Sequence, residues 1–474
     1  MASFGNSTNL KPSPASAHVK KNLVPLVTLT VLFFMWGFIT CMNDILIPYL
    51  RKLFTLNYTE SMLVQLCFFG AYFIGSLIYF IISTTGGDPI NRVGYKKGII
   101  FGIILSAAGC LLFYPASAFA SYGLFLTALF VLGLGFTVLQ ITANAYVTLL
   151  GSPETASGRL NMTQAFNSLG TTLAPIIGGH LVFSIFRNAD NSLSSEATKV
   201  PYIAFALILV LVAIIISKVK LPEFNLGTED AAGSTEGFGA LKFMNLKLGV
   251  LGIFFYVGAE VGIGSLMISY IEHAMHLDED ASKGFLALYW GGAMAGRFMA
   301  SFAFNKDISM GKRIVYMILV SAGILGLLYY ISGLQWEQMS FFALMMVVNI
   351  IGFLLGKSSS SFSLALFAVA NIILVSVGLM APGEVSVHML LGIGLFNSIM
   401  FSNIYTLGIA GLGKYTSQGS SLLVMAILGG ALLPMLQGRI ADKVGLKASY
   451  IVPLLCYVYI AIFGLWCYRR KIAD

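Results

Sequence analysis

The feature that most constrains this fold is a series of long apolar runs. Fourteen of them follow one another along the chain, at 24–50, 61–83, 97–116, 121–150, 158–186, 201–217, 247–272, 284–304, 313–332, 338–356, 361–380, 387–410, 420–437 and 449–468. A helix that crosses a bilayer needs about 20 apolar residues, whereas a barrel strand is about half as long and alternates in polarity. Since backbone groups in lipid must bond within their own segment, the runs predict an all-α integral membrane protein with 14 transmembrane helices.

The composition agrees with this class and excludes others. Only 10% of the 474 residues are charged, against about 25% in a soluble domain. Most Lys and Arg fall in loops that share one side if both termini are cytoplasmic, which is the usual orientation bias. This clustering accounts for the net charge of +8, so we expect a bilayer as the partner and no nucleic acid.

Two sets of matching residues relate the first half of the chain to the second. Phe33, Gly37 and Tyr49 recur 221 positions later as Phe254, Gly258 and Tyr270, whereas Leu132, Asn144 and Pro175 recur 259 positions later as Leu391, Asn403 and Pro434. Inverted or parallel repeats in an apolar chain are typical of secondary transporters. The change of spacing predicts that the second half contains an inserted pair of helices.

These patterns predict the domain organisation. We expect a disordered cytoplasmic tail at 1–20, an N-terminal six-helix bundle at 21–220, a cytoplasmic linker at 221–246, and a C-terminal bundle at 247–474 with an extra hairpin at about 334–380. The linker is rich in Gly, Glu, Asp and Thr, a composition that favours flexibility.

Three charges lie well inside predicted spans: Asp44, Glu260 and Arg297. Each costs about 2.5–3.5 kcal/mol at the centre of a bilayer, so each is a candidate functional group. A carboxylate kept from water takes up a proton more readily, and Asp44 could therefore cycle between protonated and ionised forms. The alternative for Asp44 is a permanent hydrogen bond between helices.

Glu260 and Arg297 have several possible roles. Glu260 could bind hydroxyl groups of a substrate, carry a coupling ion, or neutralise Arg297 on the next span. For Arg297 a structural ion pair or a latch between gates is the favoured interpretation.

Uncharged polar residues gather on the predicted spans. The candidates for substrate binding are Asn43, Gln140, Asn144, Gln164, Asn167, Asn397 and Asn403. Amides both donate and accept hydrogen bonds, which suits a polyhydroxylated, uncharged ligand. Trp36 and Trp290 could supply a platform for a sugar ring, although any one amide could instead join two helices and any one Trp could be an interfacial anchor.

A short loop between the second and third spans carries a further motif. The sequence Gly87-x-x-x-Asn91-Arg92-x-Gly94-x-Lys96-Lys97 resembles the loop signature of the major facilitator superfamily, with Asn91 where an Asp is usual. By this resemblance Arg92 and Gly94 are gating or structural residues.

Longer strings resemble one branch of that superfamily, the fucose/glucose/galactose:cation symporters. They include Asn43-Asp44, Gln140-x-x-Ala143-Asn144, Arg159-Leu-Asn161-x-x-Gln164-Ala-Phe166-Asn167, Tyr256-Val-Gly-Ala-Glu260, Trp290-Gly-Gly-x-x-x-Gly296-Arg297 and Gly394-Leu-Phe-Asn397. The resemblance covers nearly the whole chain outside the tails, linker and extra hairpin. It implies a major facilitator fold with two pseudo-symmetric six-helix bundles.

The resemblance also implies a function and site residues. Asp44 matches the carboxylate for sugar binding and coupling, and Gln164 matches a sugar-contacting glutamine. Gln140 stands where fucose carriers have a glutamate, so Glu260 is the candidate second acid; Ser402-Asn403 replaces a usual Pro-Thr.

We therefore expect a hexose importer that works by alternating access and proton symport, with glucose, galactose or mannose ahead of fucose. Sodium coupling is the nearest alternative, followed by a drug/proton antiporter and a non-transporting sugar receptor. We expect no enzymatic activity, no cofactor and no metal, and a monomer in the bacterial inner membrane with both termini cytoplasmic.

Overall fold

The structure, a computed structural model, describes most of the chain. The described residues are 23–86, 89–150, 156–185, 195–221, 239–304, 308–356, 359–412 and 416–472. The expected tail at 1–20, residues 222–238 of the expected linker and the side chain of Arg92 lie outside them. Over the described ranges the regular structure is helical and contains no strand, as expected for an all-α protein.

The first half of the chain forms one bundle. Its long helices are α1 (Leu23–Leu53), α3 (Leu63–Gly86), α5 (Tyr95–Leu111), α7 (Tyr122–Leu149), α8 (Ala156–His180) and α9 (Lys199–Lys218), with short helices α2 (Tyr58–Ser61), α4 (Pro89–Val93) and α6 (Phe113–Ala118) at their ends. Helix α1 packs on α8, and α5 packs on both α7 and α9.

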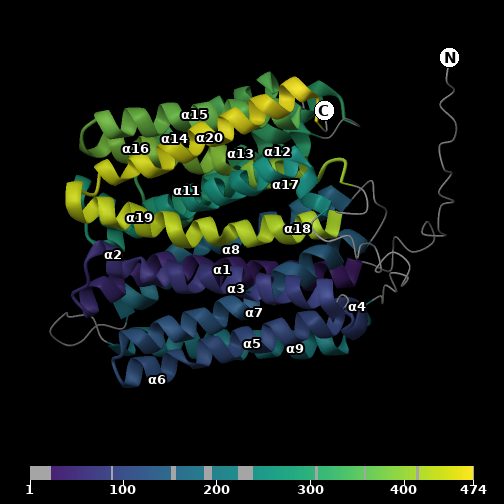
Figure 1. Cartoon of the computed structure of the whole chain (residues 1–474). Coiled ribbons are helices and arrows are strands. Elements are labelled where there is room, and N and C mark those ends of the chain that lie inside the picture. The colour runs from purple at the N-terminus through teal and green to yellow at the C-terminus, as the bar shows by residue number, and fades with distance from the viewer. Residues whose placement is uncertain are drawn as a thin grey trace, which may run out of the picture.

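The second half forms the other bundle. Its helices are α11 (Met244–Met275), α12 (Glu279–Ala303), α13 (Met310–Ser332), α14 (Trp336–Leu355), α15 (Ser360–Met380), α16 (Gly383–Asn397), α17 (Met400–Ile409), α18 (Thr416–Met425), α19 (Gly429–Val444) and α20 (Ile451–Arg470). Figure 1 shows the two halves side by side, with the purple and blue helices of the first below the green and yellow helices of the second.

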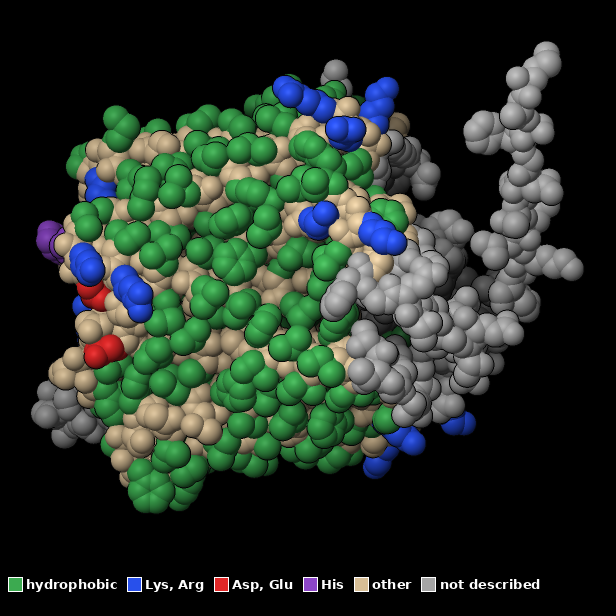
Figure 2. Space-filling view, in the orientation of Figure 1, with side chains coloured by type: hydrophobic (Ala, Val, Ile, Leu, Met, Phe, Trp, Pro, Cys, Tyr) green, Lys and Arg blue, Asp and Glu red, His purple; other side chains and the backbone are tan. Residues whose placement is uncertain are grey.

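Twelve stretches of the described residues are long and apolar enough to cross a membrane. Helices α8 and α12 have 25 residues each but are more polar, and they complete the expected fourteen. They pack against each other between the bundles, which explains their polarity, since these faces do not meet lipid. The face seen in Figure 2 is apolar over the helices, with Lys and Arg gathered at the two ends.

Glycines show that the two bundles share one plan. A side chain at Gly170 of α8 would meet the backbone carbonyl of Phe34 in α1, and one at its repeat mate Gly429 would meet that of Phe254 in α11. Each bundle thus brings its fifth repeated helix into backbone contact with its first, which only glycine permits. Gly94 ends the turn between α4 and α5 with φ of +88°, a conformation that favours glycine.

The packing of the helices favours another position for the inserted pair than the one expected from the sequence. Helix α15 packs on α16 and α20 as α5 packs on α7 and α9, so it holds a place in the repeated plan. Helix α13 packs on α12 and α14 and has the smallest buried share of the twelve candidate spans, 22%. We therefore propose Met310–Leu355 as the surplus pair in place of the hairpin expected at 334–380, because packing and not local sequence identifies the equivalent of α5.

Candidate functional site

Asp44 lies where the two bundles meet. It is only 4% exposed on α1, and its carboxylate accepts hydrogen bonds from three helices of both bundles. Nε2 of Gln65 on α3 lies 3.2 Å from Oδ1, Oγ of Ser265 on α11 lies 3.4 Å from Oδ1, and Nε1 of Trp290 on α12 lies 3.1 Å from Oδ2. Cys41 adds a longer sulfur contact of 3.7 Å from its own helix. In this conformation Asp44 therefore makes hydrogen bonds between helices, which is the alternative role considered for it.

A small cavity adjoins this carboxylate. The cavity is partly open, has a volume of about 30 Å³, and is lined by Thr40, Cys41, Asp44, Gln65, Phe69, Thr171, Val261 and Trp290. Both bundles contribute to its wall. The lining combines one carboxylate, hydroxyls and an amide with aromatic rings, which is the mixture found in sites for small polar ligands.

Gly264 makes room for this arrangement. A side-chain carbon at this position of α11 would lie 3.0 Å from Cζ2 of Trp290 and 3.2 Å from Oδ2 of Asp44. Any larger residue would therefore press on the hydrogen bond between the indole and the carboxylate. The close approach of α1, α11 and α12 depends on this missing side chain.

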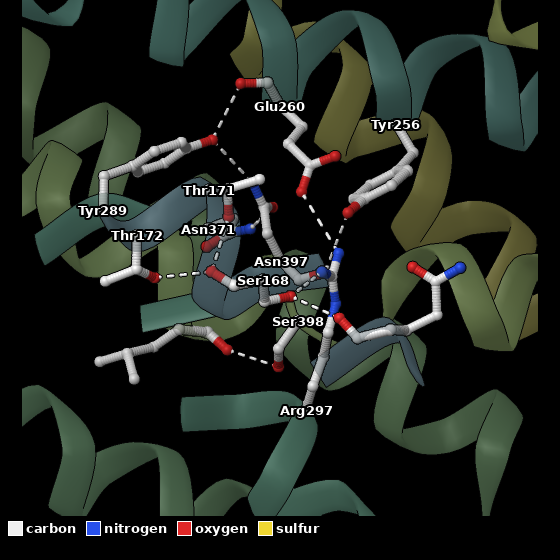
Figure 3. Close-up of polar contacts among 12 residues, drawn as sticks. Ser168, Thr171, Thr172, Tyr256, Glu260, Tyr289, Arg297, Asn371, Asn397 and Ser398 are labelled. Atoms are coloured by element: carbon white, nitrogen blue, oxygen red, sulfur yellow. Dashed lines mark hydrogen bonds and ion pairs between the residues drawn. The ribbon is translucent and has the colours of Figure 1, made fainter. Parts of the chain in front are cut away.

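A second polar cluster contains the other two intramembrane charges (Figure 3). Nη2 of Arg297 lies 3.9 Å from Oε1 of Glu260, and Nη1 of Arg297 donates to Oγ of Ser168 on α8. Of the three roles weighed for Glu260, the ion pair is the one present in this structure. Because Ser168 belongs to the first bundle, Arg297 also links the bundles, as a latch would.

Asn397 is the centre of a hydrogen-bonded group within the second bundle. Its Oδ1 accepts from Nδ2 of Asn371 at 2.9 Å and from the hydroxyl of Tyr457 at 2.8 Å, and its Nδ2 donates to the hydroxyl of Tyr289 at 3.1 Å. The side chain is 0% exposed. In this conformation the amide joins four helices, and Figure 3 shows the Asn371, Tyr289 and Asn397 side chains of this group. A contact between Asn397 and substrate stays a prediction.

Three other expected ligands make contacts that join helices. Nδ2 of Asn403 donates to the carbonyl of Ser360 at 2.9 Å, and Nδ2 of Asn167 donates to that of Phe33 at 2.9 Å. The indole of Trp36 donates to the hydroxyl of Tyr72 at 3.2 Å. For the two asparagines, the alternative of polar contacts between helices is the one seen here.

The remaining expected ligands stay available. Asn144 and Gln164 pair at 3.4 Å across α7 and α8, and Gln140 is buried one turn away on α7. Both amide atoms of Asn43 are buried and have no hydrogen-bond partner among the described residues. A buried amide without a partner is costly, so it is suited to receive a ligand or water.

Two residues of the site were missed in the sequence. Gln65 and Ser265 lie in apolar runs, and isolated polar residues there carry no pattern of their own. A signal for Ser265 did exist: it stands 221 positions after Asp44, which is the shift of the first repeat set. The pseudo-symmetry therefore brings a residue and its repeat mate into contact between the bundles.

Comparison with known proteins identifies the family. A family model described as Major Facilitator Superfamily matches residues 27–370. The chain is 42% identical over 442 residues to the "Glucose/galactose transporter" of Brucella abortus biovar 1 (strain 9-941), with 93% of each chain covered. It is 29% identical to the "L-fucose-proton symporter" of Escherichia coli (strain K12), covering 93% of this chain and 92% of that one.

Solved structures agree with this relationship. A crystal structure of the transporter FucP in the outward conformation matches with a TM-score of 0.65 and 26% identity, covering 94% of this chain and 99% of that one. The family and these relatives are transporters, which confirms the expectation that this chain is not an enzyme. The chain is a multi-pass membrane protein of the Major Facilitator Superfamily and belongs to its fucose/glucose/galactose:cation symporter branch.

Proposed function

We propose that this protein imports a monosaccharide by proton symport, with two bundles that rock around the site at Asp44. Glucose, galactose or mannose are the favoured substrates, and fucose is less favoured. The name of the relative at 42% identity supports the hexose, and the name of the relative at 29% identity supports the proton. We further propose that the protein is a monomer in the bacterial inner membrane with both termini cytoplasmic.

The observation that carries this proposal is the position of Asp44. A single buried carboxylate accepts hydrogen bonds from both bundles beside a cavity that both bundles line. A proton on Asp44 removes its charge and weakens its role as an acceptor, so protonation bears on the contact between the bundles. Proton and sugar would bind together, and the loaded carrier would then change conformation.

Gln140 supports two parts of the proposal: that fucose is less favoured as a substrate, and that Asp44 is the residue that carries the proton. By the family resemblance it stands where fucose carriers have a glutamate, and an amide cannot carry a proton. Glu260 is a second, largely buried carboxylate on α11, but in this conformation it is paired with Arg297. We therefore assign proton carriage to Asp44 and propose sugar contacts for Asn43, Gln140, Asn144 and Gln164.

Sodium coupling is the second candidate, and one observation favours it. Oγ1 of Thr40 and Oε1 of Gln65 belong to residues that line the cavity with Asp44, and both atoms are buried without a partner among the described residues. Oxygen atoms around a carboxylate suit a hard cation.

Uptake of labelled hexoses into proteoliposomes tests both candidates. Under an imposed pH gradient without sodium we expect concentrative uptake of glucose or galactose by the wild type and none by Asp44→Asn. If uptake requires a sodium gradient, the coupling ion is sodium and not the proton. Absence of uptake for every hexose under either gradient would refute the symporter.

A further inference from the structure

Asp44 and three donors, Gln65, Ser265 and Trp290, form a clasp between the bundles. Asp44 and Gln65 belong to the first bundle, whereas Ser265 and Trp290 belong to the second. Gln65 is 2% exposed and Ser265 is 1% exposed, so water does not compete for these bonds in this conformation. The bonds therefore depend on the bundles staying together.

Gln65 holds the clasp from two sides. Its Nε2 donates to Oδ1 of Asp44 at 3.2 Å and to Oγ of Ser265 at 2.9 Å. The hydroxyl of Ser265 is then free to donate its own hydrogen to Oδ1 of Asp44, at 3.4 Å. One amide group thus fixes both the carboxylate and the hydroxyl, which come from opposite bundles.

All of these donors favour a charged acceptor. A carboxylate accepts hydrogen bonds about twice as strongly as a neutral group, so the clasp is tight when Asp44 is ionised and loose when it is protonated. Each cycle moves one proton onto the carboxylate and off again, and Gln65 and Ser265 keep their own hydrogens throughout. Their contribution is to link the charge of Asp44 to the distance between the bundles.

Few charged groups surround Asp44 among the described residues, so its charge is linked to the distance between the bundles mainly by the neutral donors. Among the described residues of the second bundle, Glu260 on α11 is the charged group with an electrostatic effect on Asp44, and Arg297 of α12 lies 3.9 Å from Glu260. Cys41 is the titratable group on its own helix, at 3.7 Å. From α3 and α8 the cavity receives Gln65 and Thr171, which carry no charge.

We propose that Gln65 and Ser265 are positioning residues that set the pH at which Asp44 gives up its proton and so couple that proton to separation of the bundles. This inference rests on the proposed function, because it names the residues that make a proton at Asp44 act on the conformation. It assigns to Gln65 and Ser265 no contact with the sugar.

The test is equilibrium exchange of labelled galactose across proteoliposomes with the same pH on both sides and no sodium. Exchange needs the protonated, loaded carrier, so it should fall as Asp44 ionises with rising pH. Removing a donor disfavours the ionised form. For Ser265→Ala and Gln65→Met we expect the midpoint to move to higher pH by roughly one unit, since one pH unit corresponds to about one hydrogen bond to a charged group.

Matched variants give the comparison. Ser269 lies one turn further along α11, is buried, and has a hydroxyl without a partner among the described residues, so Ser269→Ala should keep the wild-type midpoint. Ser265→Thr retains the hydroxyl group and should therefore also keep the wild-type pH midpoint of exchange. In the Asp44→Asn variant, exchange of galactose should be independent of pH. Adding Ser265→Ala to this variant should then leave the pH dependence unchanged.

The outcomes separate the two proposals. A wild type that exchanges no hexose refutes the proposed function itself. A wild type with a normal pH dependence whose midpoint is unchanged in both Ser265→Ala and Gln65→Met overturns the clasp alone. Gln65→Met provides the second measurement if Ser265→Ala does not fold, as judged by size-exclusion chromatography.

Discussion

Lys52 at the end of α1 and Glu272 at the end of α11 form an ion pair of 2.9 Å between the two bundles. On the proposed orientation both residues lie at the extracellular ends of these helices. Nearby, the carboxylate of Asp442 in α19 accepts from the backbone N–H groups of Tyr58 and Thr59 at 2.9 Å and from the hydroxyl of Thr59 at 2.6 Å. The bundles are therefore bonded together at this end.

Asp442→Ala should favour the conformation that is open at this end. It removes three hydrogen bonds between the bundles, and exposed bonds of this kind contribute about 1 kcal/mol or less each. We expect a shift of roughly five-fold or more in the ratio of open to closed molecules. Distances between spin labels placed on the ends of α2 and α19 would report this ratio.

Lys52→Ala provides the contrast to that variant. The Lys52 side chain is 45% exposed, so its pair with Glu272 should contribute well under 1 kcal/mol and the ratio should change less than two-fold. An equal effect of the two variants would mean that the exposed pair of Lys52 and Glu272 holds this end closed as strongly as the three bonds of Asp442, which contradicts this prediction.

Arg297→Met should destabilise the protein more than the double variant Arg297→Met with Glu260→Gln. The single change leaves a largely buried carboxylate without its partner, whereas the double change removes the charge as well. We expect a loss of about 2 kcal/mol in the free energy of unfolding for the single variant and recovery of at least half of it in the double variant. Thermal unfolding in detergent measures both, and no recovery would contradict a structural pair.

Asn397→Leu should lower stability without changing which hexose is preferred. The change leaves the buried hydroxyl of Tyr457 and the amide nitrogen of Asn371 without their partner, at a cost of about 1–3 kcal/mol for each unsatisfied group. Tyr289 loses one hydrogen bond but still donates to the carbonyl of Glu260. Asn403→Leu, which loses one bond, should cost less. A changed order of preference among glucose, galactose and mannose would indicate that Asn397 contacts the substrate.

Gly264→Ala should abolish transport in a protein that still folds. The added methyl group would meet Trp290 at 3.0 Å and Asp44 at 3.2 Å, so the indole or the carboxylate must move. We expect at least a ten-fold loss of hexose uptake. Gly326→Ala on α13, where an added carbon meets nothing within 4 Å, is the control and should transport normally.

The relation between sequence and structure differs from residue to residue. Asp44 was identifiable as a functional group because a charge in an apolar run is costly wherever its helix packs. Asn397 and Asn403 look equally polar in the sequence, yet the structure uses them to join helices. The amides alone did not distinguish a ligand site from a helix contact, because that depends on which neighbours lie within about 3 Å.

The sequence by itself determined the class of the protein. Apolar runs of bilayer length are a local property, so fourteen helices could be predicted without any tertiary contact, and the 221- and 259-residue repeats predicted two matching bundles. Only the tertiary structure decided that Ser265 meets Asp44, that Arg297 pairs with Glu260, and that α15 packs on α16 and α20. The physical reason is that each of these relationships depends on how helices distant in the chain pack, whereas hydropathy depends only on neighbouring residues.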